Sequence, residues 1–120
     1  MGERWGVRPV PAELVDRYVT EGWWTDATLG ERTAAWLTKA PTTPVHVHSR
    51  DRGWHGTFAD LEHDARRLVT LLREHGIESG APVAFQLPNC REAIAAFAGL
   101  AIGGYVLVPI VAIYGRKEVG

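Results

Sequence analysis

The sequence has few of the residues that covalent or charge-driven functions require. Cys90 is its single cysteine, which excludes an internal disulfide. Basic and acidic residues number 13 and 14, so the chain lacks the basic excess typical of nucleic-acid-binding proteins. The first residues, MGERWGVRPVP, lack the apolar core of a secretory signal, and Gly6 stands where a myristoylation motif that starts at Gly2 requires Ser or Thr. We therefore expect a cytoplasmic protein without a nucleic-acid partner.

Phosphate-binding motifs are absent as well. The sequence contains no G-x-x-x-x-G-K-[ST] run. Gly103-Gly104 resembles a phosphate turn, but the pair follows an expected helix and precedes an expected strand, the reverse of the order in a dinucleotide-binding loop. We interpret it as a helix terminator. The sequence thus predicts no catalytic, cofactor-binding or metal-binding residue.

The longest charge-free run, Ala93 to Tyr114, raises the alternative of a membrane-anchored small protein, because it is long enough to cross a bilayer as a helix. Gly103-Gly104 and Pro109 interrupt the run, and its second half is β-branched and short. The pattern therefore favours a helix followed by a buried strand.

The N-terminal third predicts two helices. Residues 1–22 are expected to be a lead-in segment with a short helix that begins at Pro11. Its apolar side is formed by Leu14, Val15, Tyr18 and Val19. Thr28 and Glu31 have the spacing of a capping box for a second helix, which Pro41 ends. Its apolar surface is formed by Leu29, Ala35, Trp36 and Leu37.

A hairpin and a long helix are expected next. Residues 45–48 alternate strictly, 50–53 form a turn with the solvated tip Arg50-Asp51-Arg52, and 54–57 return as the partner strand. Thr57 and Asp60 form the next capping pair, for a helix that continues to Gly76. Its apolar face, at helical spacing, is Leu61, Ala65, Leu68, Val69 and Leu72.

The remaining elements predict a βαβ unit and hence an α/β fold class. Residues 83–87 form an apolar strand, and Asn89 with Glu92 is expected to cap a helix that ends at Gly103. Residues 105–110 are apolar on both faces. They predict a buried strand parallel to 83–87, joined to it by a right-handed crossover.

Three histidines in the expected hairpin raise the question of a zinc site. His46 and His48 share one face of a strand, and His55 on the return strand would add a third imidazole. Polar residues on the open face of a hairpin explain the same pattern, so we predict no metal site. His63 and His75 are expected to face solvent or the dipole at the C-terminal end of the long helix.

Cys90 and the tryptophans have ordinary structural explanations. Cys90 is expected at a helix N-terminus, where partial positive charge favours a thiolate, but no histidine adjoins it to make a catalytic pair. We interpret it as a small buried side chain. The five tryptophans are spread over separate segments, which is typical of packing rather than of a ligand platform. They are Trp5, Trp23, Trp24, Trp36 and Trp54.

An ordered set of residues over nearly 100 positions resembles the start of the adenylate-forming superfamily of acyl-CoA synthetases and aryl-acid ligases. The set is Thr57-Phe58 with Leu61, Gly76, Gly80, Val83 to Asn89, Gly104, Val106, Pro109 and Glu118. The run Gly22 to Thr25, with Pro109-Ile110 and Ile113-Tyr114, is similar to the branch that acts on cyclic or aromatic acids. Departures from the family pattern are Cys90, Tyr105 and Gly115-Arg116-Lys117, which affect packing rather than chemistry.

The resemblance implies that residues 23–120 are an incomplete N-terminal subdomain: a β-hairpin plus a βαβ unit flanked by helices. Family members use ATP and Mg²⁺ to convert a carboxylic acid to an acyl-adenylate, and then pass the acyl group to coenzyme A or a carrier thiol. The family's Ser/Thr/Gly-rich phosphate loop, metal motif and C-terminal lysine domain are absent here. We therefore expect a truncated chain that is inactive alone, and whether it is an enzyme stays open.

The alternative within a different class is a stand-alone interaction module. Two parallel strands leave unpaired edges that favour association with a partner or with a second copy.

Overall fold

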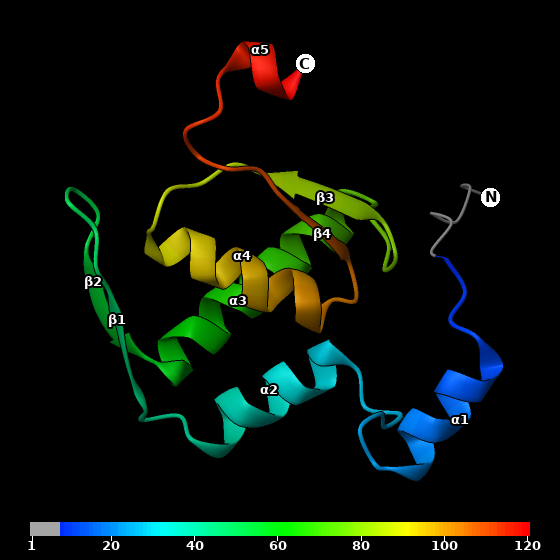
Figure 1. The fold of residues 1–120 in the computed structure, drawn as a ribbon. Coiled ribbons are helices and arrows are strands. Elements are labelled where there is room, and N and C mark those ends of the chain that lie inside the picture. The colour runs from blue at the N-terminus through cyan, green and yellow to red at the C-terminus, as the bar shows by residue number, and fades with distance from the viewer. Residues whose placement is uncertain (1–7) are drawn as a thin grey trace.

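The computed structural model describes residues 8–120, which fold into helices and short strands in a mixed α/β arrangement (Figure 1). In chain order the elements are α1 (Ala12–Thr20), α2 (Leu29–Lys39), β1 (Pro44–Val47), β2 (Trp54–Thr57), α3 (Phe58–Glu74), β3 (Pro82–Phe85), α4 (Arg91–Ile102), β4 (Val106–Pro109) and α5 (Arg116–Val119). β1 and β2 are antiparallel, and β3 and β4 are parallel. The expected hairpin, strand pair and α/β fold class are confirmed.

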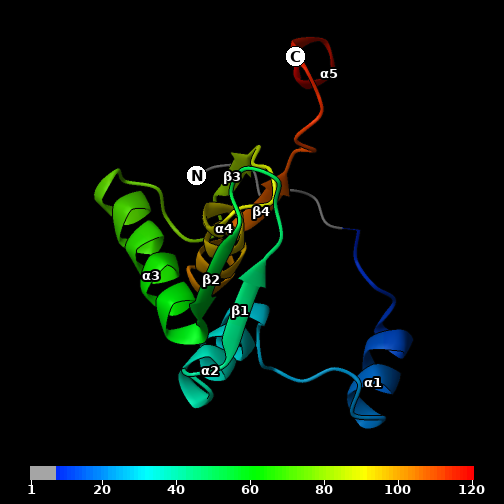
Figure 2. The same ribbon diagram turned by 90° about the vertical axis from the view of Figure 1, so that its left-hand side faces the viewer.

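Two of the three expected helix caps are present. The Thr28 hydroxyl accepts a hydrogen bond from the Glu31 backbone N–H, while the Glu31 carboxylate accepts one from the Thr28 N–H at 2.7 Å. Thr57 and Asp60 repeat this box at the start of α3, so the last residue of β2 is also the N-cap of the next helix. The hairpin therefore runs directly into α3 (Figure 2).

The prediction that Asn89 caps α4 was wrong. The helix starts one residue later, with Cys90 as its N-cap and no side-chain capping bond. Cys90 is only 1% exposed. Burial of its side chain fixes where the helix begins, and this outweighs the local capping preference of Asn89.

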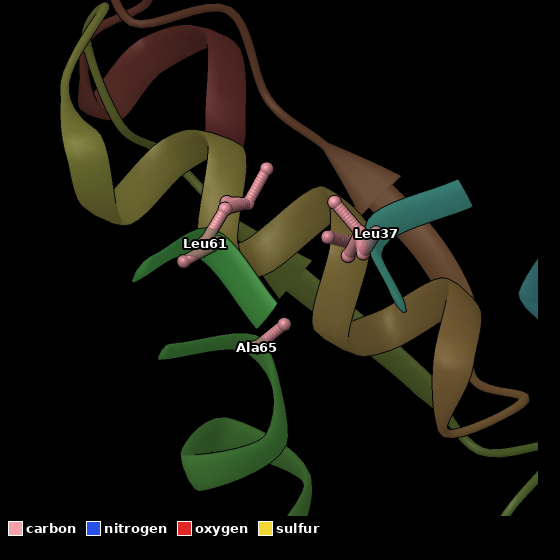
Figure 3. Packing of buried hydrophobic residues seen from close by; sticks show 5 residues of the cluster. Leu37, Leu61 and Ala65 are labelled. Atoms are coloured by element: carbon pink, nitrogen blue, oxygen red, sulfur yellow. The ribbon is translucent and has the colours of Figure 1, made fainter. Parts of the chain in front are cut away.

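The core lies where α2, α3 and α4 meet. Leu37 from α2 and Leu61 with Ala65 from α3 pack against Ala95 and Ala98 of α4 (Figure 3). Small residues allow this close approach. A Cβ on Gly99 would lie 2.7 Å from the Ala65 carbonyl oxygen, so α3 and α4 are nearly in backbone contact there.

The expected apolar face of α2 was partly wrong. Leu29 and Trp36 are 67% and 60% exposed, and the buried positions are Gly30 and Leu37. A Cβ on Gly30 would lie 2.2 Å from the Ala101 carbonyl oxygen. Because Gly30 has no side chain, this side of α2 can pack directly against the backbone of α4.

The turn from α4 into β4 uses both glycines. Gly103 is the C-cap of α4 in right-handed helical conformation, and Gly104 takes the positive φ of 72° that favours glycine. Tyr105 follows and is buried, and its hydroxyl donates to the Ile77 carbonyl oxygen at 2.9 Å. Gly103 leaves room for this ring, since a Cβ there would lie 2.4 Å from Tyr105 Cε2.

β4 is less buried than its sequence predicted. α4 packs against it, yet Val106 is 39% exposed and the other strand residues are half-buried or exposed. Both faces were expected to be covered. Within residues 8–120 the parallel sheet has two strands only, so each strand has one edge without a partner strand.

The two ends of the described chain stand apart from the core. α1 contains no buried residue, and both it and α5 lie at the periphery in the two views (Figures 1 and 2). A helix is present in the expected segment, over Ala12–Thr20 with Pro11 as its N-cap.

The charge-free run also has the expected structure: its helix ends at Ile102 and a strand follows. Between residues 8 and 120, no helix combines the length and apolarity needed to cross a membrane.

Candidate functional site

An open hollow of about 730 Å³ lies at the carboxyl ends of the two parallel strands. In α/β proteins, ligands commonly bind in the crevice outside this end of a sheet. The hollow is lined by His48, Ser49, Arg50, Phe85, Leu87, Pro88, Asn89, Ala93, Phe97, Pro109, Ile110, Val111, Ala112 and Ile113. Most of these side chains are apolar, and the polar ones come from the turn of the hairpin and from Asn89. An apolar lining with few polar groups suits an apolar body better than a phosphate.

Two contacts shape the hollow. The rings of Phe85 and Phe97 meet edge to face with centroids 5.1 Å apart, which fixes β3 against α4. The Gln86 side-chain amide donates to the carbonyl oxygens of Val111 and Tyr114 at 3.0 and 2.7 Å. This glutamine therefore braces the segment that follows β4. The hollow is built by tertiary contacts between residues 12 to 28 positions apart, which the sequence pattern did not reveal.

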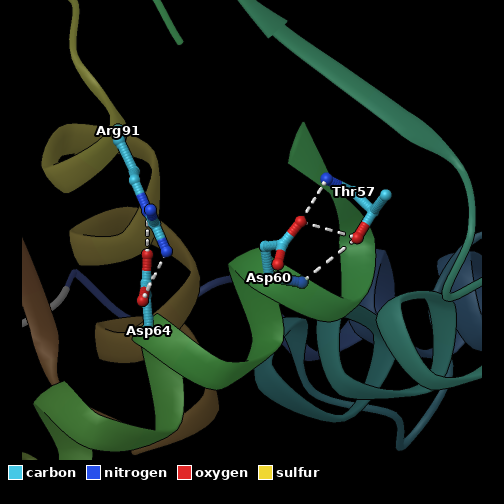
Figure 4. A network of polar contacts seen from close by, with 4 residues as sticks. All are labelled: Thr57, Asp60, Asp64 and Arg91. Carbon is cyan, nitrogen blue, oxygen red and sulfur yellow. Dashed lines mark hydrogen bonds and ion pairs between the residues drawn. The ribbon is translucent and has the colours of Figure 1, made fainter. Parts of the chain in front are cut away.

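A second groove, of about 860 Å³, runs between α3 and α4, and half of the residues that line it are charged. Arg91 makes a bidentate contact with Asp64, at 2.5 and 3.1 Å, and its guanidinium lies 4.9 Å from the centre of the Trp54 ring (Figure 4 shows the ion pair). Arg66 is paired with Glu62 on the same helix. Arg91 and Arg66 therefore have anionic partners, whereas Arg67, which also lines the groove, is exposed. The contacts of Arg91 join the hairpin, α3 and α4.

Hydrogen bonding shifts the pKa of several groups near these helix starts. The Thr57 side chain and backbone N–H hold the pKa of Asp60 below its usual value, and the Thr28 backbone and side chain do the same for Glu31. Its own backbone N–H and the Cys90 side chain lower the pKa of Glu92. The hydrogen bond to Asp64 raises the pKa of Arg91. All four shifts favour the charged forms and follow from capping and ion pairing, not from a catalytic arrangement.

Only two of the three hairpin histidines come together. His46 and His55 are directly opposite each other across the hairpin, with their Nδ1 atoms 2.6 Å apart. His48 lies beyond the end of β1 and is exposed. Over the described chain, no group of three or more His, Cys, Asp or Glu side chains is placed to hold a metal ion.

The other residues considered from sequence have structural positions. Cys90 is buried, so it does not present a thiol to solvent. His63 and His75 are exposed, and His75 at the C-terminal end of α3 contacts the Leu71 carbonyl oxygen at 2.8 Å. The tip Arg50-Asp51-Arg52 is exposed as expected.

The tryptophans do not form one platform. Trp23 and Trp24 lie against Tyr18, Trp36 lies beneath Lys39, and Trp54 lies beneath Arg91. Trp5 lies outside the described residues.

The residues present do not fit ATP or its Mg²⁺. Neither hollow is lined by the glycine-rich loop and lysine that would neutralise a triphosphate. The two lysines of the sequence are Lys39, which lies over Trp36, and Lys117 in α5. No chemical step through a nucleotide can be built from these side chains.

Comparison with known proteins identifies the family. The family model described as AMP-binding enzyme matches residues 33–120, about three quarters of the chain. The chain belongs to the AMP-binding enzyme family. The suspected relationship to adenylate-forming ligases is thereby confirmed, and the hairpin and βαβ unit are the N-terminal part of the AMP-binding enzyme fold.

Curated AMP-binding enzymes match much of this chain. The salicyl-AMP ligase / salicyl-S-ArCP synthetase of Mycobacterium tuberculosis is 31% identical over 115 residues, covering 93% of this chain and 20% of the relative. The medium-chain fatty-acid–CoA ligase of Escherichia coli is 34% identical over 105 residues, covering 84% of this chain and 18% of the relative. The chain thus spans a fifth or less of the length of these relatives.

Solved structures of related enzymes also superimpose on most of this chain. The apo structure of Mycobacterium smegmatis MbtA superimposes with a TM-score of 0.81 at 30% identity, covering 95% of this chain and 21% of that one. The Mycobacterium tuberculosis fatty acyl CoA synthetase gives a TM-score of 0.66 at 29% identity, covering 77% and 18%.

Proposed function

We propose that this chain provides the N-terminal structural segment of an ATP-dependent acyl or aryl acid ligase and does not catalyse adenylation by itself. The observation that carries the proposal is the combination of a family match over residues 33–120 with the absence of a phosphate cradle from the same residues. The chemistry of such a ligase requires neutralisation of the leaving pyrophosphate. In this account that work belongs to other segments of the enzyme.

The exposed surface supports a structural role. The accessible surface is 9336 Å², whereas a compact monomer of this mass exposes about 6,400 Å². Large apolar side chains contribute to the excess, among them Trp36 at 60%, Phe97 at 47% and Ile113 at 88% exposure. Surfaces of this kind are covered when further layers of an α/β fold pack on them.

For the whole enzyme we propose ATP, Mg²⁺ and coenzyme A or a carrier thiol as reactants alongside a carboxylic acid. An aromatic or cyclic acid is the favoured class. The salicyl-AMP ligase matches 93% of this chain, and the fatty-acid ligase of Escherichia coli matches 84%. We also propose a cytoplasmic location, since this class of ligase consumes ATP.

Acid-dependent ATP–pyrophosphate exchange tests the proposal. The purified 120-residue chain is expected to show no exchange above background with salicylate, benzoate or medium-chain fatty acids. Robust exchange that depends on an added acid would overturn the structural role. Circular dichroism on the same sample verifies that the chain is folded when the assay is done.

A further inference from the structure

A site with a different chemistry lies on the hairpin, at two residues that line neither the hollow nor the groove. His46 on β1 and His55 on β2 are directly paired in the antiparallel register. Both side chains are exposed, their ring planes are inclined at 84° and their ring centroids are 4.6 Å apart. Two imidazoles therefore converge on one point of the surface.

The distance between the two Nδ1 atoms, 2.6 Å, decides what the pair can do. Without a metal, one Nδ1 carries a proton and donates it to the other. Two nitrogens bound to one ion at about 2.0–2.1 Å lie about 2.8–3.0 Å apart when they are at right angles, and about 3.3–3.4 Å apart in a tetrahedron. The observed spacing is nearer to the right-angled arrangement. Binding also requires both rings to turn, so that the two Nδ1 lone pairs point to the ion instead of to each other.

We propose that His46 and His55 form a two-histidine chelate for a divalent transition metal that prefers tetragonal coordination, with Cu²⁺ as the tightest-binding ion. Imidazole nitrogens suit copper, nickel and zinc, and affinity among divalent ions peaks at Cu²⁺. The proton on the donating Nδ1 moves through solvent to Nε2 of the same ring. Both imidazoles then stay neutral and each presents an Nδ1 lone pair. Water fills the other coordination positions, because within residues 8–120 no third ligand is placed nearby.

The position on two strands predicts a structural effect of binding. An ion shared by β1 and β2 cross-links the hairpin, and a ligand that binds only the folded state stabilises it by mass action. His46 and His55 line neither the hollow nor the groove described above. The proposed metal site therefore does not depend on the ligase assignment.

Titration calorimetry and electron paramagnetic resonance of the 120-residue chain with CuCl₂ test the proposal. The parent protein is expected to bind one Cu²⁺ ion with a tetragonal spectrum that shows coupling to imidazole nitrogen. His46→Gln and His55→Gln are each expected to weaken this binding roughly tenfold or more, because each leaves a single imidazole. His48→Gln, on the same hairpin, is the matched control and is expected to bind as the parent does.

A second readout keeps the proposal testable if a variant loses its fold. In the parent protein, Cu²⁺ should broaden the ring-proton resonances of His46 and His55 first, while those of His63 and His75 remain. Equal affinity of the parent and His46→Gln, or first broadening of other histidines, would overturn the proposal.

Discussion

At the scale of single residues, the threonine–acid pairs at helix starts are the clearest local source of helix stability. Thr28 with Glu31 and Thr57 with Asp60 each satisfy backbone N–H groups that a helix leaves free at its first turn. The Thr57 pair has the larger structural consequence, because it also ends β2 and sets the direction of α3.

Asp60→Asn is expected to lower the free energy of unfolding at neutral pH. Hydrogen bonds from Thr57 lower the pKa of Asp60 in the folded chain, so ionised Asp60 stabilises the fold above its unfolded-state pKa of about 3.9. This contribution is lost as the pH falls through the lower folded-state pKa. The difference between Asp60→Asn and the parent should therefore shrink on acidification.

Urea unfolding from neutral pH into the acid range measures this difference. Asp51→Asn, at the exposed hairpin tip, is the matched control and should show no such trend. A constant gap between Asp60→Asn and the parent at all pH values would show that the capping charge is irrelevant.

Arg91→Lys is expected to lower the melting temperature although it preserves charge. A lysine cannot reproduce the bidentate contact with Asp64 or the contact of the guanidinium with the Trp54 ring. Arg73→Lys, at the end of α3, is the control for a change of residue type alone. Differential scanning fluorimetry of both variants compares them, and equal melting temperatures would contradict a joining role for Arg91.

Local sequence patterns predicted two of the helix caps, and the third, at α4, shows where such patterns fail. Thr28 and Thr57 were identified from spacing alone, because their partners lie three residues away. The start of α4 was not, because burial of Cys90 is set by distant residues and overrides the preference of Asn89.

At the scale of elements, close helix contacts depend on glycines that the sequence pattern treats as neutral. Gly30 and Gly99 bring α2 and α3 against α4 with almost no side chain between the backbones. Periodicity identified the helices and the buried Leu37, but it also placed Leu29 and Trp36 on the buried face of α2. It missed Gly30, since a glycine carries no hydropathy signal.

Gly99→Ala is expected to destabilise the fold by about 1–3 kcal/mol, even though alanine favours helix formation. The new Cβ would lie 2.7 Å from the Ala65 carbonyl oxygen, so α3 and α4 must move apart. Gly53→Ala is the control, because its Cβ would meet nothing nearer than 3.5 Å. Chemical denaturation measures both, and a Gly99→Ala protein more stable than the parent would refute this account of the α3–α4 contact.

For the parallel strands, the sequence pattern predicted the pairing correctly but the degree of burial incorrectly. Their apolar residues correctly predicted a parallel pair, yet Val106 is 39% exposed. A strand that is apolar on both faces is suited to burial between neighbouring elements. Within residues 8–120, the elements that would cover both faces of β4 are not all present.

At the scale of the whole molecule, the chain is more open than a compact domain of the same length. Its radius of gyration is 16.7 Å, compared with about 14 Å for a compact domain of 120 residues.

The two-histidine pair also belongs to this scale. Its strands were predicted, but their register, which places His46 opposite His55, was not.

We expect the isolated chain to self-associate through the open edges of β3 and β4. Unpaired N–H and C=O groups on a sheet edge invite another strand, and a lysine at an edge opposes this. Val106→Lys should therefore reduce the mass measured by light scattering after size exclusion. Val119→Lys, in α5 and similarly exposed, is the control, and an equal effect of both variants would assign the association to another surface.

The central claim is that this chain forms the N-terminal scaffold of an AMP-binding enzyme and leaves the chemistry to the rest of the protein. The most direct test replaces the matching 115-residue segment of the Mycobacterium tuberculosis salicyl-AMP ligase with the corresponding residues of this chain. ATP–pyrophosphate exchange is then measured with salicylate and with medium-chain fatty acids. We predict that the folded hybrid retains exchange and keeps the preference for salicylate. A folded hybrid without exchange, or one whose acid preference changes, would contradict the claim.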